Sequence, residues 1–420
     1  MPSPTQTPSQ QKSSLPVITL LVIAVLINYV DRGNLALAAP LLSKDWGLST
    51  SQLGILLSAF FWTYVLLQIP VGWLVDRFSA SAILAFGFFA WSAATIFTGL
   101  SRGFATLFAM RLLLGVGEAV VFPASSKIFS ESLEEKDRGL ANGFLVAAIR
   151  WGTAVGAFGG GLLMARFGWR RTFLAIGLAG LLWLPAWQRW KPASAPRVMP
   201  PRPGPEMSSF AAILRLRPFW GASIGHLAEN YLLYLLMSWL PFYLVHERHL
   251  STASMAWTAG LIYAIDSTAA IVTGRVADLC IRRGANACSA RKWPMVVGLL
   301  IATVSLLACS VAGPKTWLAS LAGAAVGCGT SCSGVYAIPQ TLAGPRLAGR
   351  WVGMQNCVAN FAGIVAPVLT GFLVERTGSF RVALILAAAV ATVGALAWIV
   401  GVRASDQPTP LPDVAFAEAL

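Results

Sequence analysis

Runs of about 20 apolar residues recur along the whole chain, and no other feature limits its fold as strictly. A helix of about 20 residues is needed to cross the hydrocarbon core of a bilayer. Of the 420 residues, 56% are hydrophobic and only 11% are charged, and the mean hydropathy is +0.68. Soluble domains carry about 25% charged residues. The sequence therefore predicts an all-α membrane protein that crosses the bilayer many times.

Twelve apolar runs are expected to span the membrane. The Pro-rich, basic stretch 190–217 is the widest gap between them, and it divides them into six-helix halves at 15–189 and 218–402. The polar segment 1–14 is expected to be a disordered tail rather than a signal peptide, and 403–420 a second tail. The spans are expected near 15–40, 51–76, 79–100, 104–128, 139–165, 170–189, 218–245, 252–277, 292–312, 316–340, 350–374 and 379–402.

The distribution of Lys and Arg predicts the orientation. If both termini and the stretch 190–217 share one side, 19 of the 31 basic residues lie there and nine on the other side. Cytoplasmic loops are enriched in Lys and Arg, so both termini and the linker are predicted to be cytoplasmic, in a plasma membrane such as a bacterial inner membrane. The net charge of +14 does not indicate a nucleic-acid partner, because the basic residues lie in short gaps between apolar runs.

The two halves are related in sequence. A duplicated six-helix unit with parallel halves is typical of secondary transporters that work by alternating access, with a central site. Channels can also be duplicated, and saturable flux that responds to a pH gradient would distinguish a carrier from a channel. At an offset of 202 the matches are Asn28-Tyr29 with Asn230-Tyr231, Leu48-Ser49-Thr50 with Leu250-Ser251-Thr252, Gly72 with Gly274 and Asp76 with Asp278; at an offset of 210 they are Gly161, Arg166, Gly168 and Arg171 with Gly371, Arg376, Gly378 and Arg381.

A short motif follows spans two and eight on the predicted cytoplasmic side. It contains Gly72, Asp76 and Arg77 in the first copy, and Gly274 and Asp278 in the second. Glycine allows close helix approach, and the carboxylate can bind a helix N-terminus or an arginine. The Asp could be no more than a solvated charge in a loop. Because two copies of the motif occur at one offset, we favour a gating contact that breaks when the halves rock.

Several motifs occur in the same order as in a known family. In this order they resemble the major facilitator superfamily, and most closely its anion:cation symporter branch, which includes sugar-acid transporters, sialin and the vesicular glutamate transporters. The resemblance covers most of the chain and implies the major facilitator fold, with twelve helices in two pseudo-symmetric six-helix bundles. The motifs are Asn28-Tyr-Val-Asp31-Arg32, Ser58–Tyr64 with Gln68-Ile-Pro70, Arg111–Ala119 with Phe122-Pro-Ala, Arg217–Trp220 with Trp239-Leu-Pro241, and Asn356, Asn360 and Pro367.

Seven charged residues fall inside the expected spans. A charge at the centre of a membrane helix costs about 2.5–3.5 kcal/mol on insertion scales, so each one needs a role or a partner. Asp31 and Arg32 share a helix face with Asn28, and Arg111 and Glu118 share another face about 10 Å apart along the axis. The seven are Asp31, Arg32, Arg111, Glu118, Arg150, Glu229 and Asp266.

Arginines and carboxylates divide the work of anion transport naturally. The planar guanidinium group can bind both oxygens of a carboxylate, and a buried carboxylate can exchange a proton near neutral pH. The resemblance implies the same division, with Arg32 and Arg111 meeting the substrate anion and Asp31 and Glu118 carrying protons. The structural alternative is that Asp31 with Arg32, and Arg111 with Glu118, only neutralise each other.

Further candidates are less specific. Span seven carries Glu229, Asn230 and Tyr234 at three, four and eight residues after His226, so all four lie on one face of the helix. Neutral polar residues could instead bridge helices, and a lone histidine is often such a bridge. Arg150 and Asp266 depart from the branch pattern: Arg150 either adds a third positive charge for the substrate or pairs with Glu229 or Asp266. The remaining predicted substrate contacts are Asn28, Tyr64, Asn230, Tyr234, Asn356 and Asn360, and the remaining coupling candidates are His226, Glu229 and Asp266.

These patterns favour proton-coupled symport of a small organic anion, such as a sugar acid or another carboxylate. The alternative is a proton-driven antiporter that exports an anionic or amphipathic compound. It is suggested by glycines of the fifth span, although Ala157 stands where the glycine ladder of drug antiporters has proline. The chain has no metal cluster, serine elbow or phosphate loop in its sequence, so no enzyme activity, metal or cofactor is expected. We expect a functional monomer whose partners are the anion, protons and the lipid bilayer.

Overall fold

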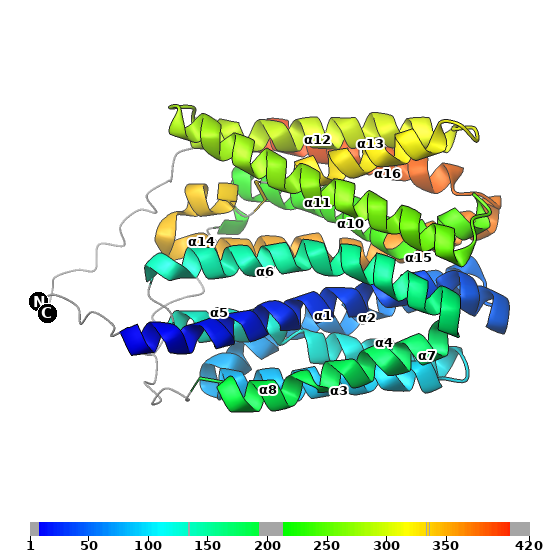
Figure 1. The fold of residues 1–420 in the computed structure, drawn as a ribbon. Coiled ribbons are helices and arrows are strands. Elements are labelled where there is room, and N and C mark those ends of the chain that lie inside the picture. Colours follow the sequence, from blue (N-terminus) through cyan, green and yellow to red (C-terminus); the bar gives the residue numbers. More distant parts are fainter. Residues whose placement is uncertain (1–7, 133–134, 193–212, 333, 336, 404–420) are drawn as a thin grey trace, which may run out of the picture. The chain divides into compact units, whose positions relative to one another are not determined.

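The structure is a computed structural model that describes residues 8–132, 135–192, 213–332, 334–335 and 337–403. Within these ranges the chain is helical apart from short connections, and no strand occurs (Figure 1). The predicted all-α class is confirmed. The helices are α1 (Pro8–Trp46), α2 (Thr50–Arg77), α3 (Ala80–Leu100), α4 (Phe104–Glu118), α5 (Val121–Ser132), α6 (Glu135–Val155), the π-helix η1 (Gly156–Gly160), α7 (Gly161–Leu181), α8 (Trp183–Trp190), α10 (Arg217–His246), α11 (Thr252–Arg282), α12 (Ala287–Ser310), α13 (Trp317–Ser331), α14 (Ala337–Asn360), α15 (Ala362–Thr377) and α16 (Arg381–Gly401).

All twelve expected spans fall on these helices. Within the described ranges, eight stretches are long and apolar enough to cross a membrane by length and composition. The other four expected spans, 139–165, 170–189, 218–245 and 316–340, are not among these eight stretches. The eight stretches are Leu15–Trp46, Thr50–Gln68, Ala80–Leu100, Phe104–Phe129, Thr252–Arg282, Ala287–Ser310, Trp351–Thr377 and Arg381–Gly401.

The helix boundaries differ from the expected ones at several places. Helix α1 begins at Pro8, inside the segment expected to be a disordered tail. Span four is broken directly after Glu118, because Pro123 has no N–H to donate to the carbonyl of Ala119 four residues earlier. Span ten is interrupted after Ser331, and α14 is helical through 341–349, where a loop was expected.

The start of the second helix is repeated in the two halves. Helix α2 begins at Thr50 and α11 at Thr252, two positions that match under the first of the two sequence offsets. The hydroxyl oxygen of the preceding serine, Ser49 or Ser251, accepts a hydrogen bond from the amide three residues later, at 3.3 and 3.2 Å. An N-cap serine satisfies an amide that has no partner inside the helix. The repeat read from the sequence is therefore also present in the helix caps.

Two left-handed turns are repeated as well. The φ angles are 63° at Gly47 and 56° at His249, which match under the first offset, and 78° at Gly168 and 69° at Gly378, which match under the second. Glycine adopts this region without steric cost, whereas His249 is the only non-glycine residue to do so among the described positions.

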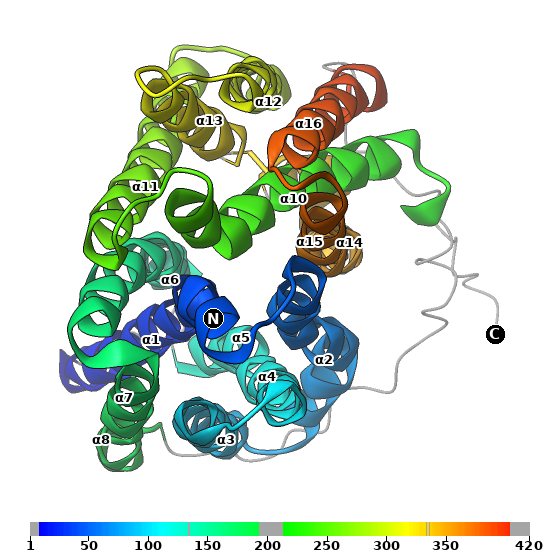
Figure 2. The ribbon, with the colours of Figure 1, turned by 90° about the vertical axis from the view of Figure 1, so that its right-hand side faces the viewer.

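The chain divides into two compact units. Unit 1 comprises residues 1–199, 235–264 and 363–380, and unit 2 comprises 200–234, 265–362 and 381–420. In unit 1, α3 packs against α4 and α7 (Figure 2), and in unit 2, α12 packs against α13 and α16. The boundary expected within 190–217 stays a prediction, because 193–212 lie outside the described residues.

Close packing fixes α1 against α6 and η1 in unit 1. A Cβ atom at Gly152, Gly156 or Gly160 would come within 3.0 Å of an atom of α1. These glycines of the fifth span therefore serve close helix contact here. The contact sets the face that α1 turns toward α4.

Candidate functional site

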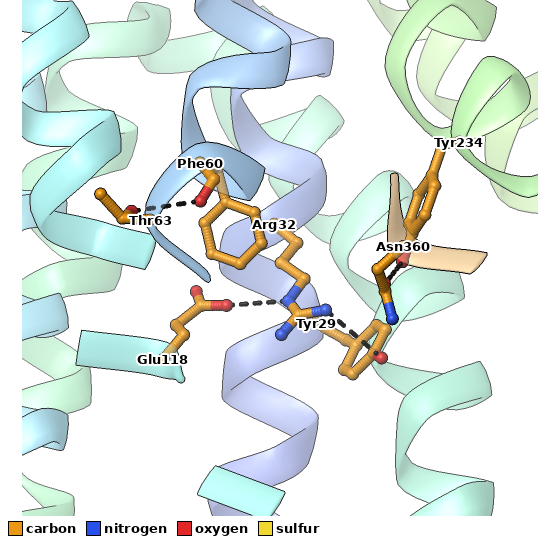
Figure 3. A network of polar contacts seen from close by, with 7 residues as sticks. All are labelled: Tyr29, Arg32, Phe60, Thr63, Glu118, Tyr234 and Asn360. Carbon is orange, nitrogen blue, oxygen red and sulfur yellow. Dashed lines mark hydrogen bonds and ion pairs between the residues drawn. The ribbon is translucent and has the colours of Figure 1, made fainter. Parts of the chain in front are cut away.

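A buried ion pair joins α1 to α4 in unit 1. Nε of Arg32 donates a hydrogen bond to Oε2 of Glu118 at 2.8 Å, and the two side chains are 4% and 0% exposed (Figure 3). The pair runs between helices, whereas the structural alternative paired Arg32 with Asp31 and Glu118 with Arg111. Glu118 is the last residue of α4, directly before the break that Pro123 causes.

Further buried polar groups surround this ion pair. Nδ2 of Asn34 donates to Oδ1 of Asp31 at 3.5 Å, and the carboxylate of Asp31 is attracted by Arg111 and repelled by Glu118. Asp31 and Arg111 are 3% and 4% exposed, and Nε of Arg111 has no hydrogen-bond partner among the described residues. Asn28 is fully buried near Glu118, and its side chain makes no hydrogen bond of normal geometry within the described part of the chain. Buried donors without partners are costly, so these groups are suited to binding a polar ligand.

Three aromatic rings hold the guanidinium group of Arg32. Its Cζ lies 4.7 Å from the ring centre of Tyr29, 4.8 Å from that of Phe60 and 4.5 Å from that of Tyr64. Such cation–π contacts stabilise a buried cation. Tyr64 was a predicted site residue, whereas Tyr29 and Phe60 were missed. Spacing could have found Tyr29, which lies three residues before Arg32 on one helix, but not Phe60, which reaches Arg32 from another helix.

In unit 2, predicted neutral residues of α10 and α14 meet. The hydroxyl of Tyr234 donates to Oδ1 of Asn360 at 2.6 Å (Figure 3). Nδ2 of Asn360 donates to the carbonyl of Asn356 at 2.8 Å. Asn360 is the last residue of α14, so its amide satisfies a carbonyl at the helix end. Asn230 of α10 is also buried.

His226 takes part in a polar contact between helices of unit 2. Its Nδ1 lies 3.3 Å from Nε2 of Gln355, whose oxygen accepts a hydrogen bond from Nε1 of Trp351. Nε2 of Gln355 also donates to the carbonyl of Val335. The geometry agrees with a histidine that bridges helices, and its coupling role stays a prediction. Gln355 had no signal in the sequence.

The other charged candidates of the second half are buried too. Glu229 on α10 and Asp266 on α11 are each 5% exposed. The side chain of Arg150 lies outside the described residues, so its pairing with either of them stays a prediction. No group of three His, Cys, Asp or Glu side chains within the described ranges could hold a metal ion.

The two copies of the gating motif lie near the ends of α2 and α11. Arg77 and Asp278 are exposed, and the side chain of Asp76 lies outside the described residues. A Cβ at Gly72 or Gly274 would meet no described atom within 4 Å, so neither glycine makes a close helix contact in this structure. Their gating role stays a prediction.

Duplicated helical halves with opposite charges buried inside the membrane-spanning part define a secondary transporter of small solutes. The family model of the Major Facilitator Superfamily matches residues 21–287 and 285–418. The chain belongs to this superfamily. The fold predicted from the motifs is thereby confirmed.

Relatives of known name are transporters of small acids. The chain is 30% identical to the probable L-galactonate transporter of Escherichia coli, over 91% of this chain and 88% of that protein. It is 29% identical to the probable galactarate/D-glucarate transporter GudP of Bacillus subtilis, over 94% and 93% of the two chains. It is also 29% identical to the probable sulfoacetate transporter SauU of Cupriavidus necator, over 91% and 92%. These similarities confirm the resemblance to the sugar-acid transporters.

A solved structure shares the fold. The crystal structure of a bacterial homologue of the human lysosomal transporter Spinster, inward-facing and unoccupied, aligns with a TM-score of 0.82. The alignment covers 97% of this chain and 100% of that one, at 18% sequence identity. At this identity the likeness supports the fold alone.

Proposed function

We propose that this protein carries a small organic anion, such as a sugar acid, together with protons across the membrane. The observation that supports it most is the buried pair of Arg32 and Glu118 beside Arg111, whose Nε has no partner among the described residues. Relatives named for galactonate, glucarate and sulfoacetate transport support an acidic substrate.

The ion pair suggests how anion and proton are coupled. A carboxylate binds arginine best through two parallel N–H groups, and Glu118 occupies the Nε of Arg32. A substrate carboxylate that binds side-on, through Nε and Nη2 of Arg32, therefore displaces Glu118. The released carboxylate is fully buried, where a charge without a partner is costly, so it takes up a proton. Anion binding and proton binding then favour each other.

The charge balance of the site also indicates that an anion and a proton bind together. The four groups Asp31, Arg32, Arg111 and Glu118 sum to zero when all are ionised. One monovalent anion makes the group negative, and one proton restores neutrality. A dianion would require two protons, for which Asp31 is the second acceptor. We therefore expect the number of protons to follow the charge of the substrate.

In unit 2, the hydroxyl of Tyr234 and the side chains of Asn230, Asn356 and Asn360 provide neutral hydrogen-bonding groups. We assign them to the hydroxyl groups of such a substrate, because neutral donors and acceptors bind hydroxyls without needing a counter-charge. A sulfonated substrate without hydroxyls would need them less.

Uptake into proteoliposomes tests this proposal. L-galactonate, D-glucarate and sulfoacetate would be offered with and without an inward proton gradient. We expect saturable accumulation of at least one of them, which collapses when the gradient is removed. Glu118→Gln should keep exchange of internal for external anion but lose gradient-driven accumulation, and Arg111→Ala should lose binding. Accumulation that ignores the gradient would rule out coupling, and outward accumulation would support the antiporter.

We also propose the bacterial inner membrane as its location, with both termini in the cytoplasm. The excess of basic residues on one side and the bacterial relatives support it. A reporter enzyme that works only in the cytoplasm should be active when it is fused to the C-terminus, and one that works only in the periplasm should be inactive there. Activity of a periplasmic reporter at the same site would reverse the orientation.

A further inference from the structure

One aromatic ring lies beside both arginines of the candidate anion site. The ring centre of Phe60 is 4.8 Å from Cζ of Arg32 and 5.5 Å from Cζ of Arg111. Phe60 is 1% exposed, so water does not screen these contacts. Two guanidinium groups repel each other, and the negative faces of an aromatic ring attract both.

The backbone of unit 1 fixes the position of this ring. Helix α2 crosses α4 at Gly115, where a Cβ would overlap the carbonyl oxygen of Phe60 and the hydroxyl of Thr63. The hydroxyl of Thr63 donates to the carbonyl of Leu112 on α4 at 2.8 Å (Figure 3 shows its neighbouring bond to Phe60). The ring of Tyr64 also stacks on that of Phe60, with centres 5.1 Å apart and planes at 25°.

The chemistry of the ring matters as much as its place. Phenylalanine has no hydrogen-bonding group, so it stabilises a guanidinium group without occupying its N–H donors. A glutamate in the same place would neutralise the arginines and compete with the substrate, as Glu118 does for one N–H of Arg32. Phe60 can thus hold two cations close together without occupying any of their N–H groups.

We propose that Phe60 is a positioning residue that holds Arg32 and Arg111 as a pair for one anion. This inference rests on the proposed function of the two arginines. It adds that the electron density of the ring, and not only its volume, sets the affinity for the anion. The ring adds to the charge balance that Asp31 and Glu118 provide before any substrate arrives.

Fluorinated phenylalanines test this directly, because added fluorine weakens the negative face of the ring while its shape is largely kept. Phenylalanine with one, two or three fluorine atoms would be incorporated at position 60 of the full chain. The matched control is the same series at Phe129, which is 2% exposed on α5. Dissociation constants for L-galactonate, D-glucarate and sulfoacetate would be measured by thermal shift on purified protein.

We expect the dissociation constant to rise stepwise along the series at position 60, by about 5- to 30-fold in total, and to stay constant at position 129. A constant value at position 60, in a protein that binds one of the anions, would overturn the role of Phe60 and leave the proposed function standing. Equal changes at both positions would also overturn it. Failure of the unmodified protein to bind any of the three would overturn the proposed function, and this inference with it.

Discussion

Replacing Arg32 with glutamine should make the stability of this protein depend on pH in a defined way. The substitution leaves the fully buried carboxylate of Glu118 without its ion-pair partner. The least costly response of the Glu118 carboxylate is to bind a proton. A glutamic acid in water has a pKa of about 4.3, so binding that proton at pH 7 costs about 3.7 kcal/mol, at 1.36 kcal/mol per pH unit. This agrees with the about 3–5 kcal/mol lost when one partner of a buried ion pair is removed.

The sign of the pH dependence follows from proton counting. In the Arg32→Gln variant the folded state holds a proton on Glu118 that the unfolded state has released at neutral pH. Stability therefore falls as pH rises. The exchange mechanism requires that the ion pair keep Glu118 charged in the folded parent protein, and this group then adds no slope. The destabilisation caused by the substitution should grow by about 2.7 kcal/mol between pH 6 and pH 8.

The assay is the free energy of unfolding in detergent micelles, from denaturant titrations at pH 6, 7 and 8. Glu118→Gln is the matched control: it leaves Arg32 charged at every pH, over its three rings, so its cost should not vary with pH. If Arg32→Gln destabilised the protein equally at pH 6 and pH 8, Glu118 would not need Arg32 to remain charged. The exchange mechanism would then be refuted.

Three smaller changes test other contacts. Tyr234→Phe should lower stability by about 1–3 kcal/mol, because it leaves Oδ1 of Asn360 without its hydroxyl donor, and an unchanged melting temperature would contradict that bond. Gly156→Ala should cost about 1–3 kcal/mol by pressing on α1, whereas Gly33→Ala, which faces open space, should not destabilise; equal thermal shifts would argue against close packing. Glu375→Ala should speed hydrogen exchange in the first turn of α2, where its carboxylate accepts a backbone N–H at 2.8 Å, while Glu375→Gln should preserve much of the protection.

The positions of the helices could be predicted because hydropathy is a local property. Apolar runs located the spans, and the two constant offsets between matching motifs located the repeat. The break after Glu118 could also be read from the sequence, since Pro123 lies at the required distance. The continuity of α14 could not, because Gly344, Pro345 and Gly349 usually mark a loop.

The candidate site was predictable only in part. Spacing identifies residues that share a face of one helix, such as Asn28 and Arg32 on α1. It does not identify partners 86 residues apart, such as Arg32 and Glu118. That contact depends on how α1 and α4 are rotated toward each other. The rotation is set by glycine contacts, of which Gly156 against α1 is one, and a single sequence does not say which glycines touch which helix.

The duplication provides an internal control for the buried ion pair. Tyr234 occupies the position of Arg32 in the second half, under the first of the two offsets. Helices α4 and α13 have 15 residues each and are followed by a break, so Ser331 occupies the last position, as Glu118 does. Neither Tyr234 nor Ser331 is charged, and the hydroxyl of Ser331 bonds to the carbonyl of Cys328 in its own helix. The second half keeps the helices and the break without the pair, so the fold itself does not require the pair. The proposed binding of an anion and a proton would explain why the first half retains two charges that are expensive to bury.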